Sequence, residues 1–188
     1  MPKNKTSLCK LGAAYIEAIH DELVQRLWPG TDPIARGEYR NPILIESSVG
    51  RPFQTAFGED AYPSVTSKAI ALFHSLNSNH CFFNGNKRTA VIALDHFLVA
   101  NDHVLLISNA DMYKLAEQTA SYRERGVSHE ESFQEITAAI KGFVADFRSL
   151  RQYNKQQGGK IDQFLKWSAK TRKIVRTSPL NSILPSPH

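Results

Sequence analysis

The 188-residue sequence lacks several features that would place it in a specialised class of protein. It has no run of eighteen apolar residues, which excludes a transmembrane helix. The basic segment 1–5 is followed by no apolar stretch, so we expect no secretory signal peptide. The two cysteines, Cys9 and Cys81, are too few for a disulfide framework or a cysteine metal cluster. These absences favour a globular protein, long enough to bury a core, in a reducing cytoplasm.

Acidic residues are almost absent from the end of the chain. Residues 151–188 hold eight Lys and Arg but one acid, Asp162, and have a net charge of +7. Residues 1–150 hold 15 basic and 17 acidic side chains, a net charge of −2. We therefore predict a globular domain over residues 1–150 and a basic tail over residues 151–188. The tail's composition leaves three interpretations open: a solvated helix, a nucleic-acid contact, or docking of an acidic partner.

Apolar periodicity predicts a mainly α fold. Apolar side chains recur at spacings of three and four along five segments, residues 6–28, 63–76, 87–101, 110–122 and 128–150. Residues 31–62 are rich in proline and glycine, and we expect there an ordered loop with a short hairpin around Gly50. Its strands would lie near residues 43–45 and 53–55. In the tail we expect a flexible joint at residues 156–159, then one basic helix, then coil.

The segment from His80 to Arg88 carries the chemistry. It lies between two apolar helices, at the start of the second, where the first amides have no intrahelical partner and the helix dipole is positive. Gly85 lets the backbone approach a ligand closely, and Lys87 and Arg88 add positive charge suited to phosphate. This pattern is typical of an anion-binding site.

Two further side chains supply what a transfer reaction needs. His80 can take a proton near neutral pH. Asn84 offers an amide oxygen to a hydrated magnesium ion, although the same residue could simply cap the helix. A base, a cation-binding oxygen and a phosphate site together indicate phosphoryl or nucleotidyl transfer. The aromatic Phe82 and Phe83 are predicted to be core residues, and no base is placed by the sequence to activate Cys81.

This segment resembles the signature of the Fic/Doc family, His-x-Phe-x-Asp/Asn-Gly/Ala-Asn-Gly/Lys-Arg, and specifically its Doc branch. Every specified position is met, at His80, Phe82, Asn84, Gly85, Asn86, Lys87 and Arg88. The flanking Arg51-Pro52 also looks like Doc, and the resemblance spans about residues 8–145. It implies a Fic/Doc-type helical bundle with a short β-hairpin flap before the motif helix, with ATP as co-substrate and Mg²⁺ as cofactor.

The resemblance also implies a role for each residue. His80 would deprotonate a hydroxyl of a target protein, and Asn84 would help to hold Mg²⁺. The phosphate would be bound at the helix start, by the backbone of Gly85, Asn86 and Lys87 and by the side chain of Arg88. A flap over residues 46–58 would pair with the target as an added strand. Its candidate contact residues are Arg51, Phe53 and Gln54.

Two positions favour the reaction of the Doc branch. Nucleotidyl-transferring Fic proteins usually have Gly where this chain has Lys87, and a second Arg where it has Val91. The resemblance therefore implies a toxin that transfers the γ-phosphate of ATP to elongation factor Tu and arrests translation. No internal inhibitory motif is evident, which implies inhibition in trans by a Phd-like antitoxin. Two alternatives stay open: AMP transfer, and a catalytically degenerate Fic-fold binding protein, because Asn84 replaces the commoner Asp.

Overall fold

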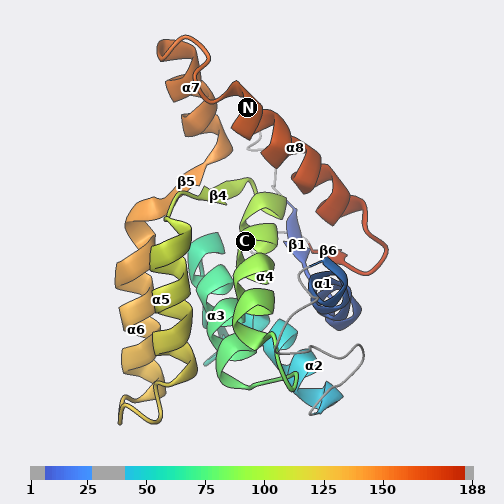
Figure 1. Ribbon diagram of the computed structural model, residues 1–188, viewed down its shortest axis with the longest axis vertical. Coiled ribbons are helices and arrows are strands. Elements are labelled where there is room, and N and C mark those ends of the chain that lie inside the picture. Colours follow the sequence, from blue (N-terminus) through green and yellow to red (C-terminus); the bar gives the residue numbers. More distant parts are fainter. Residues whose placement is uncertain (1–6, 27–40, 185–188) are drawn as a thin grey trace.

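The structure, a computed structural model, describes residues 7–26 and 41–184. Helices dominate these residues and strands are short, so the mainly α fold is confirmed (Figure 1). Within the described ranges, no helix is both long and apolar enough to cross a membrane. The elements follow in the order β1 (Leu8–Lys10), α1 (Ala13–Arg26), α2 (Pro42–Gly50), η1 (Arg51–Phe53), β2 (Thr55–Ala56), β3 (Glu59–Asp60), α3 (Val65–Ser78), α4 (Asn86–Ala100), β4 (His103–Leu105), α5 (Asn109–Ala120), α6 (His129–Ile140), η2 (Lys141–Phe143), β5 (Val144–Asp146), α7 (Phe147–Gln156), α8 (Asp162–Thr177) and β6 (Ser182–Leu184).

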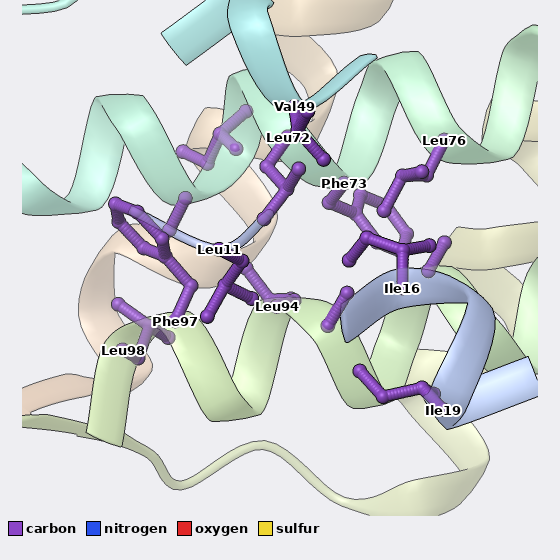
Figure 2. Close-up of a cluster of buried hydrophobic side chains, with 14 of the residues drawn as sticks. Leu11, Ile16, Ile19, Val49, Leu72, Phe73, Leu76, Leu94, Phe97 and Leu98 are labelled. Atoms are coloured by element: carbon purple, nitrogen blue, oxygen red, sulfur yellow. The ribbon is translucent and has the colours of Figure 1, made fainter. Parts of the chain in front are cut away.

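Helices α3 and α4 form the centre of the molecule. Helix α4 also contacts α1, α5 and α8, and α3 contacts α2, α5 and α6. Their facing apolar stripes build one buried cluster, to which α1 and α2 also contribute (Figure 2). Among its fully buried side chains are Ile16, Leu72, Phe73, Leu94 and Phe97. Each such side chain stabilises the fold by about 1.5–3 kcal/mol, so the loop that joins α3 to α4 is fixed at both ends by the core.

Three antiparallel strand pairs complete the fold. Strand β1 pairs with β6, which places Leu8 opposite Leu184 and joins the two ends of the described chain. Strand β4 pairs with β5 at the upper end of α4 in Figure 1. Strands β2 and β3 form the short hairpin that precedes α3. The expected hairpin therefore exists, but it lies elsewhere in the sequence.

Residues 42–50 form helix α2, so the predicted strand at residues 43–45 was wrong. Asn41 caps this helix because its side chain accepts a hydrogen bond from the Ile43 N–H at 3.0 Å, and Pro42 occupies the first helical position. The helix continues into η1, so the predicted turn around Gly50 was also wrong. The part of the predicted loop at residues 31–40 lies outside the described residues.

The hairpin turns at Phe57 and Gly58 instead. Both have positive φ, 54° and 85°, as a two-residue hairpin turn that matches the twist of its strands requires. Glycine adopts this conformation readily, but Phe57 does so with its side chain fully exposed. The buried Lys68 of α3 ties the hairpin down through an ion pair with Asp60, Nζ to Oδ1 at 2.8 Å.

The helix predicted over residues 128–150 is divided into two. Helix α6 begins with the predicted capping box of Ser128 and Glu131, but it ends at Ile140. A 3₁₀ turn and strand β5 follow before α7 starts at Phe147. The apolar spacing continues through this region because strand β5, while it pairs with β4, also packs apolar side chains against the core. Similarly, the segment predicted as a helix from residue 6 begins with strand β1, and α1 starts at Ala13.

The tail does not separate from the helical body where the composition changes. The predicted boundary at residue 150 falls inside α7, and the predicted joint is a hydrogen-bonded turn in which the Asn154 side chain accepts from the Ile161 N–H at 2.9 Å. The expected basic helix is α8, which packs on α4 and buries Val175. The expected coil contains strand β6. The division into a domain of residues 1–150 and a tail of residues 151–188 stays a prediction.

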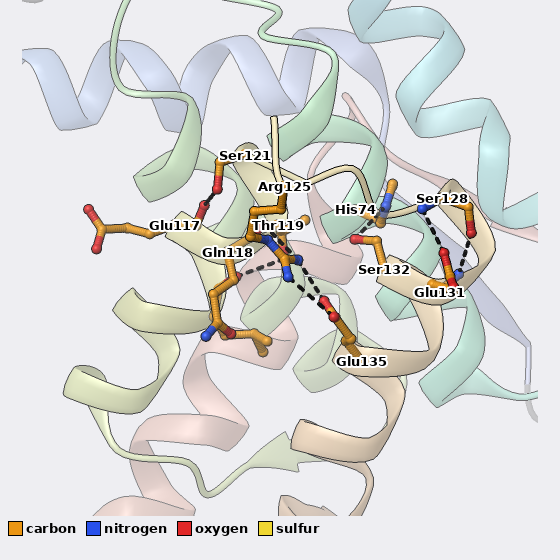
Figure 3. A network of polar contacts seen from close by, with 11 residues as sticks. His74, Glu117, Gln118, Thr119, Ser121, Arg125, Ser128, Glu131, Ser132 and Glu135 are labelled. Carbon is orange, nitrogen blue, oxygen red and sulfur yellow. Dashed lines mark hydrogen bonds and ion pairs between the residues drawn. The ribbon is translucent and has the colours of Figure 1, made fainter. Parts of the chain in front are cut away.

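Helices α5 and α6 form an antiparallel pair on the outer side of α3. Arg125 in the connecting loop binds Glu135 of α6, Nη2 to Oε2 at 2.6 Å (Figure 3). Between α6 and α3, the hydroxyl oxygen of Ser132 lies within hydrogen-bond distance of Nε2 of His74, at 3.2 Å. His74 is buried, and burial lowers its pKa to about 4, so this histidine of α3 is neutral.

Candidate functional site

His80 occupies a strained backbone position directly after α3. The helix ends with Asn79 as its cap, and His80 follows with φ of 48°, in the left-handed region. Glycine is the usual residue at this position, and a side chain there costs roughly 1–2 kcal/mol. The imidazole is partly exposed, and it forms no hydrogen bond with any described residue. A strained and solvent-accessible histidine has to be held in place by its neighbours.

Ser48 of α2 holds the chain on both sides of His80. Its hydroxyl oxygen accepts a hydrogen bond from the Asn79 amide at 3.0 Å and lies 3.7 Å from the Cys81 sulfur. Both Ser48 and Cys81 are buried. Burial raises the pKa of the Cys81 thiol, which disfavours the thiolate that a nucleophile needs. Cys81 is therefore a packing residue of the site.

Asn86 closes the loop that contains the motif. Its Oδ1 accepts a hydrogen bond from the Phe82 N–H at 2.8 Å, and its Nδ2 donates to the Phe82 carbonyl oxygen at 2.7 Å. The Asn86 side chain is buried, so these two bonds form away from water. The sequence predicted only a backbone role for Asn86. The structure shows that its side chain also fixes the shape of the loop.

A second histidine, His20 of α1, packs against the loop that contains the motif. It is 1% exposed, and its ring stacks on Phe82 with centroids 3.9 Å apart and planes 4° apart. Its Nε2 lies 3.2 Å from the Asn84 carbonyl oxygen, which can only accept, so Nε2 carries the proton. Burial lowers the pKa of His20 and keeps the ring neutral. This contact could not be predicted from the sequence, because no spacing rule relates α1 to a loop sixty residues later.

The start of α4 has backbone donors without partners among the described residues. Gly85 has φ of 78° and precedes the helix, and the first N–H to find a helical acceptor is that of Thr89, which donates to the Gly85 oxygen at 2.9 Å. The N–H groups of Asn86, Lys87 and Arg88 bond to no acceptor among the described residues. Three such amides at the positive end of a fifteen-residue helix have the arrangement that helix starts use to bind anions.

Asn84 makes a hydrogen bond that the sequence did not predict. Its Oδ1 accepts a hydrogen bond from the Gly85 N–H at 2.7 Å, so one predicted donor of the anion hole is already used. The oxygen keeps a second lone pair, which fits a magnesium ion that takes its other ligands from phosphates and water. No group of three His, Cys, Asp or Glu that could hold a metal by itself occurs in the described part of the chain.

Lys87 and Arg88 border a cavity of about 230 Å³ between α4 and α5. Its floor is apolar and includes Leu23, Ile92 and Met112. Lys87 is half-exposed and lies 3.5 Å from Glu117, Nζ to Oε1.

The guanidinium of Arg88 has no ion-pair partner among the described residues, and its residue is exposed. The helix start therefore combines free amides, two cationic side chains and an adjacent apolar cavity.

The predicted flap residues are divided between two environments. Arg51 and Phe53 lie in η1, where Arg51 donates from Nε to the Tyr62 hydroxyl at 2.9 Å and Phe53 packs edge-on against Phe97. Only Gln54 is exposed, at the foot of the hairpin. Within the predicted flap of residues 46–58, residues 46–53 are helical, and the hairpin spans residues 55–60.

The two aromatic residues of the motif also differ. Phe82 is buried, as predicted, but Phe83 was wrongly predicted as core and is 63% exposed. It lies exposed in the loop just before α4, where an apolar side chain gains nothing from the fold itself.

Comparison with known proteins agrees with this geometry. The model of the Fic/DOC family matches residues 10–98, which include the whole loop and the start of α4. The chain is 36% identical over 102 residues to the protein named Toxin Doc of Mycolicibacterium smegmatis, a match that covers 54% of this chain and 75% of that protein. No solved structure matches the chain significantly. With the complete motif folded at the start of a central helix, the chain belongs to the Fic/Doc family, on its Doc branch.

Proposed function

We propose that this protein is a Doc-type toxin that transfers the γ-phosphate of ATP to a hydroxyl of a target protein, with elongation factor Tu as the first candidate target. One observation carries the proposal: free amides at the start of α4 and the strained His80 lie at the two ends of one rigid loop. An anion held by those amides would present its phosphorus beside a base. Family membership and the similarity to a protein named Toxin Doc support the same reaction class.

The residues would divide the reaction between them. His80 takes the proton of the target hydroxyl, and the hydroxyl oxygen forms the new bond to the γ-phosphorus while the bond to the bridging oxygen breaks and ADP leaves. The amides of α4 and Arg88 bind the phosphate oxygens and stabilise their charge in the transition state. A bound Mg²⁺, held in part by Asn84, would neutralise phosphate charge.

Target recognition would use the exposed features around the loop. The hairpin at residues 55–60 carries the exposed Phe57, and Gln54 stands at its foot. An extended segment of the target could pair with this short edge, as peptides do with exposed strands. In the same proposal, a Phd-like antitoxin would inhibit the protein in trans.

The test uses ATP labelled at either the α or the γ phosphate. The protein is incubated with Mg²⁺ and either cell lysate or purified elongation factor Tu, and labelled proteins are identified by mass spectrometry. We expect label from the γ position only, and a loss of about 10²–10⁴-fold in rate in a His80→Ala variant. A His103→Ala variant, which changes a histidine at the opposite end of α4, should keep its activity.

The other outcomes contradict the proposal in different ways. Label from the α position would establish AMP transfer in place of phosphate transfer. No label from either position, with a folded protein free of antitoxin, would favour a binding protein that has lost catalysis. Labelling of a lysate protein other than elongation factor Tu would keep the reaction and replace the target.

A further inference from the structure

A second cationic site lies at the opposite end of α4 from the motif. A cleft of about 740 Å³ opens there between the end of α4, strand β4 and helix α7. Its cationic lining residues are Arg148, Arg151 and Lys155 of α7, and its amide side chains are Asn101 and Gln152. In Figure 1, α7 projects at the top of the molecule, away from the α3–α4 loop. The cleft is therefore distinct from the proposed active site.

The three cations form one stripe on α7. Spacings of three and four residues place them on one helix face, which lies beside the buried Phe147. They are exposed, and their charged groups form no hydrogen bond or ion pair with described residues, although the Arg151 guanidinium lies over the Phe147 ring. Along the axis their Cα atoms are spaced by about 4.5 and 6 Å. Groups of this charge and spacing can meet successive phosphates of one strand.

The acidic residues of the cleft do not compensate this stripe. Asp102 is paired with Arg172 of α8, Oδ1 to Nε at 2.7 Å. Asp146 caps α7, where its carboxylate accepts hydrogen bonds from the N–H and hydroxyl of Ser149. These bonds lower the pKa of Asp146, so it keeps one negative charge. The cleft consequently retains an excess of positive charge that nothing in the described fold balances.

Helix α8 carries a second group of cations. Lys166, Lys170 and Lys173 lie on the face opposite the buried Ser168 and Val175, and their side chains bind no described residue. Two aromatic side chains stand exposed on the same pair of helices, Tyr153 and Trp167, each 52% accessible. Neither ring lines the cleft, so the case for a nucleic-acid ligand rests on the arginine and lysine side chains, which suit a phosphate backbone.

We propose that the α7 cleft binds the sugar–phosphate backbone of a single-stranded nucleic acid, with the lysines of α8 as a weaker extension of the site. A cleft of this volume has the size of a small-ligand pocket, so it can admit consecutive nucleotides of one strand but not a duplex. Recognition is through phosphate, so the binding is independent of base sequence. This inference does not depend on the proposed phosphotransfer.

The test measures fluorescence anisotropy of labelled oligothymidylate or oligouridylate of about 15 nucleotides. The protein carries His80→Ala, which removes the proposed transfer activity and leaves α7 untouched. At about 50 mM salt we expect a dissociation constant in the micromolar range, weakening with a log–log salt slope of about −2 for three phosphate contacts. A duplex of the same length should bind at least about tenfold more weakly.

Two triple variants provide a matched comparison. One changes Arg148, Arg151 and Lys155 to Ala, and the other changes Lys166, Lys170 and Lys173 to Ala. Both remove three exposed positive charges from the same pair of helices, so net charge and solubility change equally. We expect the α7 variant to lose at least about tenfold in affinity and most of the salt slope, and the α8 variant to lose about threefold or less.

Three results would overturn the inference. Equal losses in both variants would show attraction by net charge without a site. Preference for the duplex would exclude the single-strand assignment. Absence of binding at about 50 mM salt, in a protein whose circular dichroism matches the parent, would remove nucleic acid as the ligand of this surface.

Discussion

The two ends of helix α4 carry positive charge in different ways. At the start of the helix the donors are backbone amides, and the loop that presents them is fixed by buried contacts from Ser48, His20 and Asn86. At the other end the charges belong to long side chains of α7 that line the cleft. A fixed set of amides suits one small anion in one orientation. Mobile side chains along a cleft suit a flexible polyanion.

Two buried asparagines, Asn86 at the start of α4 and Asn101 at its end, allow the same comparison with single residues. Asn86 bonds to Phe82, four residues away, and shapes the motif loop. Asn101 bonds to the backbone of Cys9 in β1, with its Oδ1 2.7 Å from the Cys9 nitrogen and its Nδ2 3.0 Å from the Cys9 oxygen. The first asparagine has local consequences, and the second holds distant parts of the chain together.

The largest effect is expected from the strained histidine. Replacing His80 by Gly should lower the transfer rate by about 10²–10⁴-fold, equivalent to about 3–5 kcal/mol of activation free energy. The same change should leave the free energy of unfolding unchanged or raise it, because glycine adopts positive φ without strain.

His80→Ala is the matched control for this histidine. It removes the same base but keeps a Cβ in the strained position, so it should be less stable than His80→Gly by about 1 kcal/mol. Denaturant unfolding measures the difference. Equal stability of the two variants would show that His80 is not strained.

The asparagine pair tests whether the start of α4 has a function beyond stability. Asn86→Ala and Asn101→Ala should each lower the free energy of unfolding by about 2–4 kcal/mol, because each leaves buried backbone groups without their partners. At a temperature where both variants are folded, only Asn86→Ala should lose transfer activity, by at least about tenfold. Comparable activity losses in the two variants would contradict this expectation, because they would show that Asn86 affects the reaction no more than Asn101 does.

Acid should destabilise the fold through His74. Its folded pKa of about 4 lies below the ordinary 6.5, so the unfolded state binds the extra proton between these values. Stability from this residue is complete above pH 6.5 and is lost as the pH falls toward 4, by at most about 3 kcal/mol.

Unfolding of wild type and His74→Asn as a function of pH isolates this contribution from other groups. Asp95 titrates in the opposite sense, because burial raises its pKa to about 6 and favours its neutral form. A wild-type curve as flat as that of His74→Asn between pH 6.5 and 4 would contradict the expected linkage.

The smallest effect is expected from His20, and two substitutions separate its two contacts. His20→Phe keeps a ring to stack on Phe82 but removes the donor to the Asn84 oxygen. His20→Gln keeps a donor and removes the ring. One hydrogen bond is worth about 1 kcal/mol, so His20→Phe should lower kcat by about fivefold with little change in stability or in KM for ATP. His20→Gln should instead lose stability while retaining more activity per folded molecule.

The chemistry-bearing part of the site could be predicted from the sequence because it is local. The residues from His80 to Arg88 are contiguous, and the start of an apolar helix marks where their amides are free. The supporting contacts could not be predicted. Ser48 and His20 reach the loop only through the packing of α1 and α2 on the centre of the fold, and a buried histidine in an apolar stripe carries no sequence signal of its contact.

The errors in the fold also have physical causes. Ile43, Leu44 and Ile45 favour a strand by propensity, but Asn41 and Pro42 before them supply a helix cap, and the cap prevailed. The hairpin turn contains Phe57, a residue type seldom found at positive φ, so its position had no turn signature. In both places tertiary packing or capping overrode the local preference of the side chains.

The pairing of β1 with β6 affects how the protein can be synthesised and folded. The helices that form the proposed active site are complete once residue 100 has been made, but the ladder between positions 8 and 184 needs nearly the whole chain. Contacts between residues so far apart in the sequence form slowly and are among the last to form. During translation, the motif loop can therefore assemble on a chain whose outer layer, α8 and β6, is still missing.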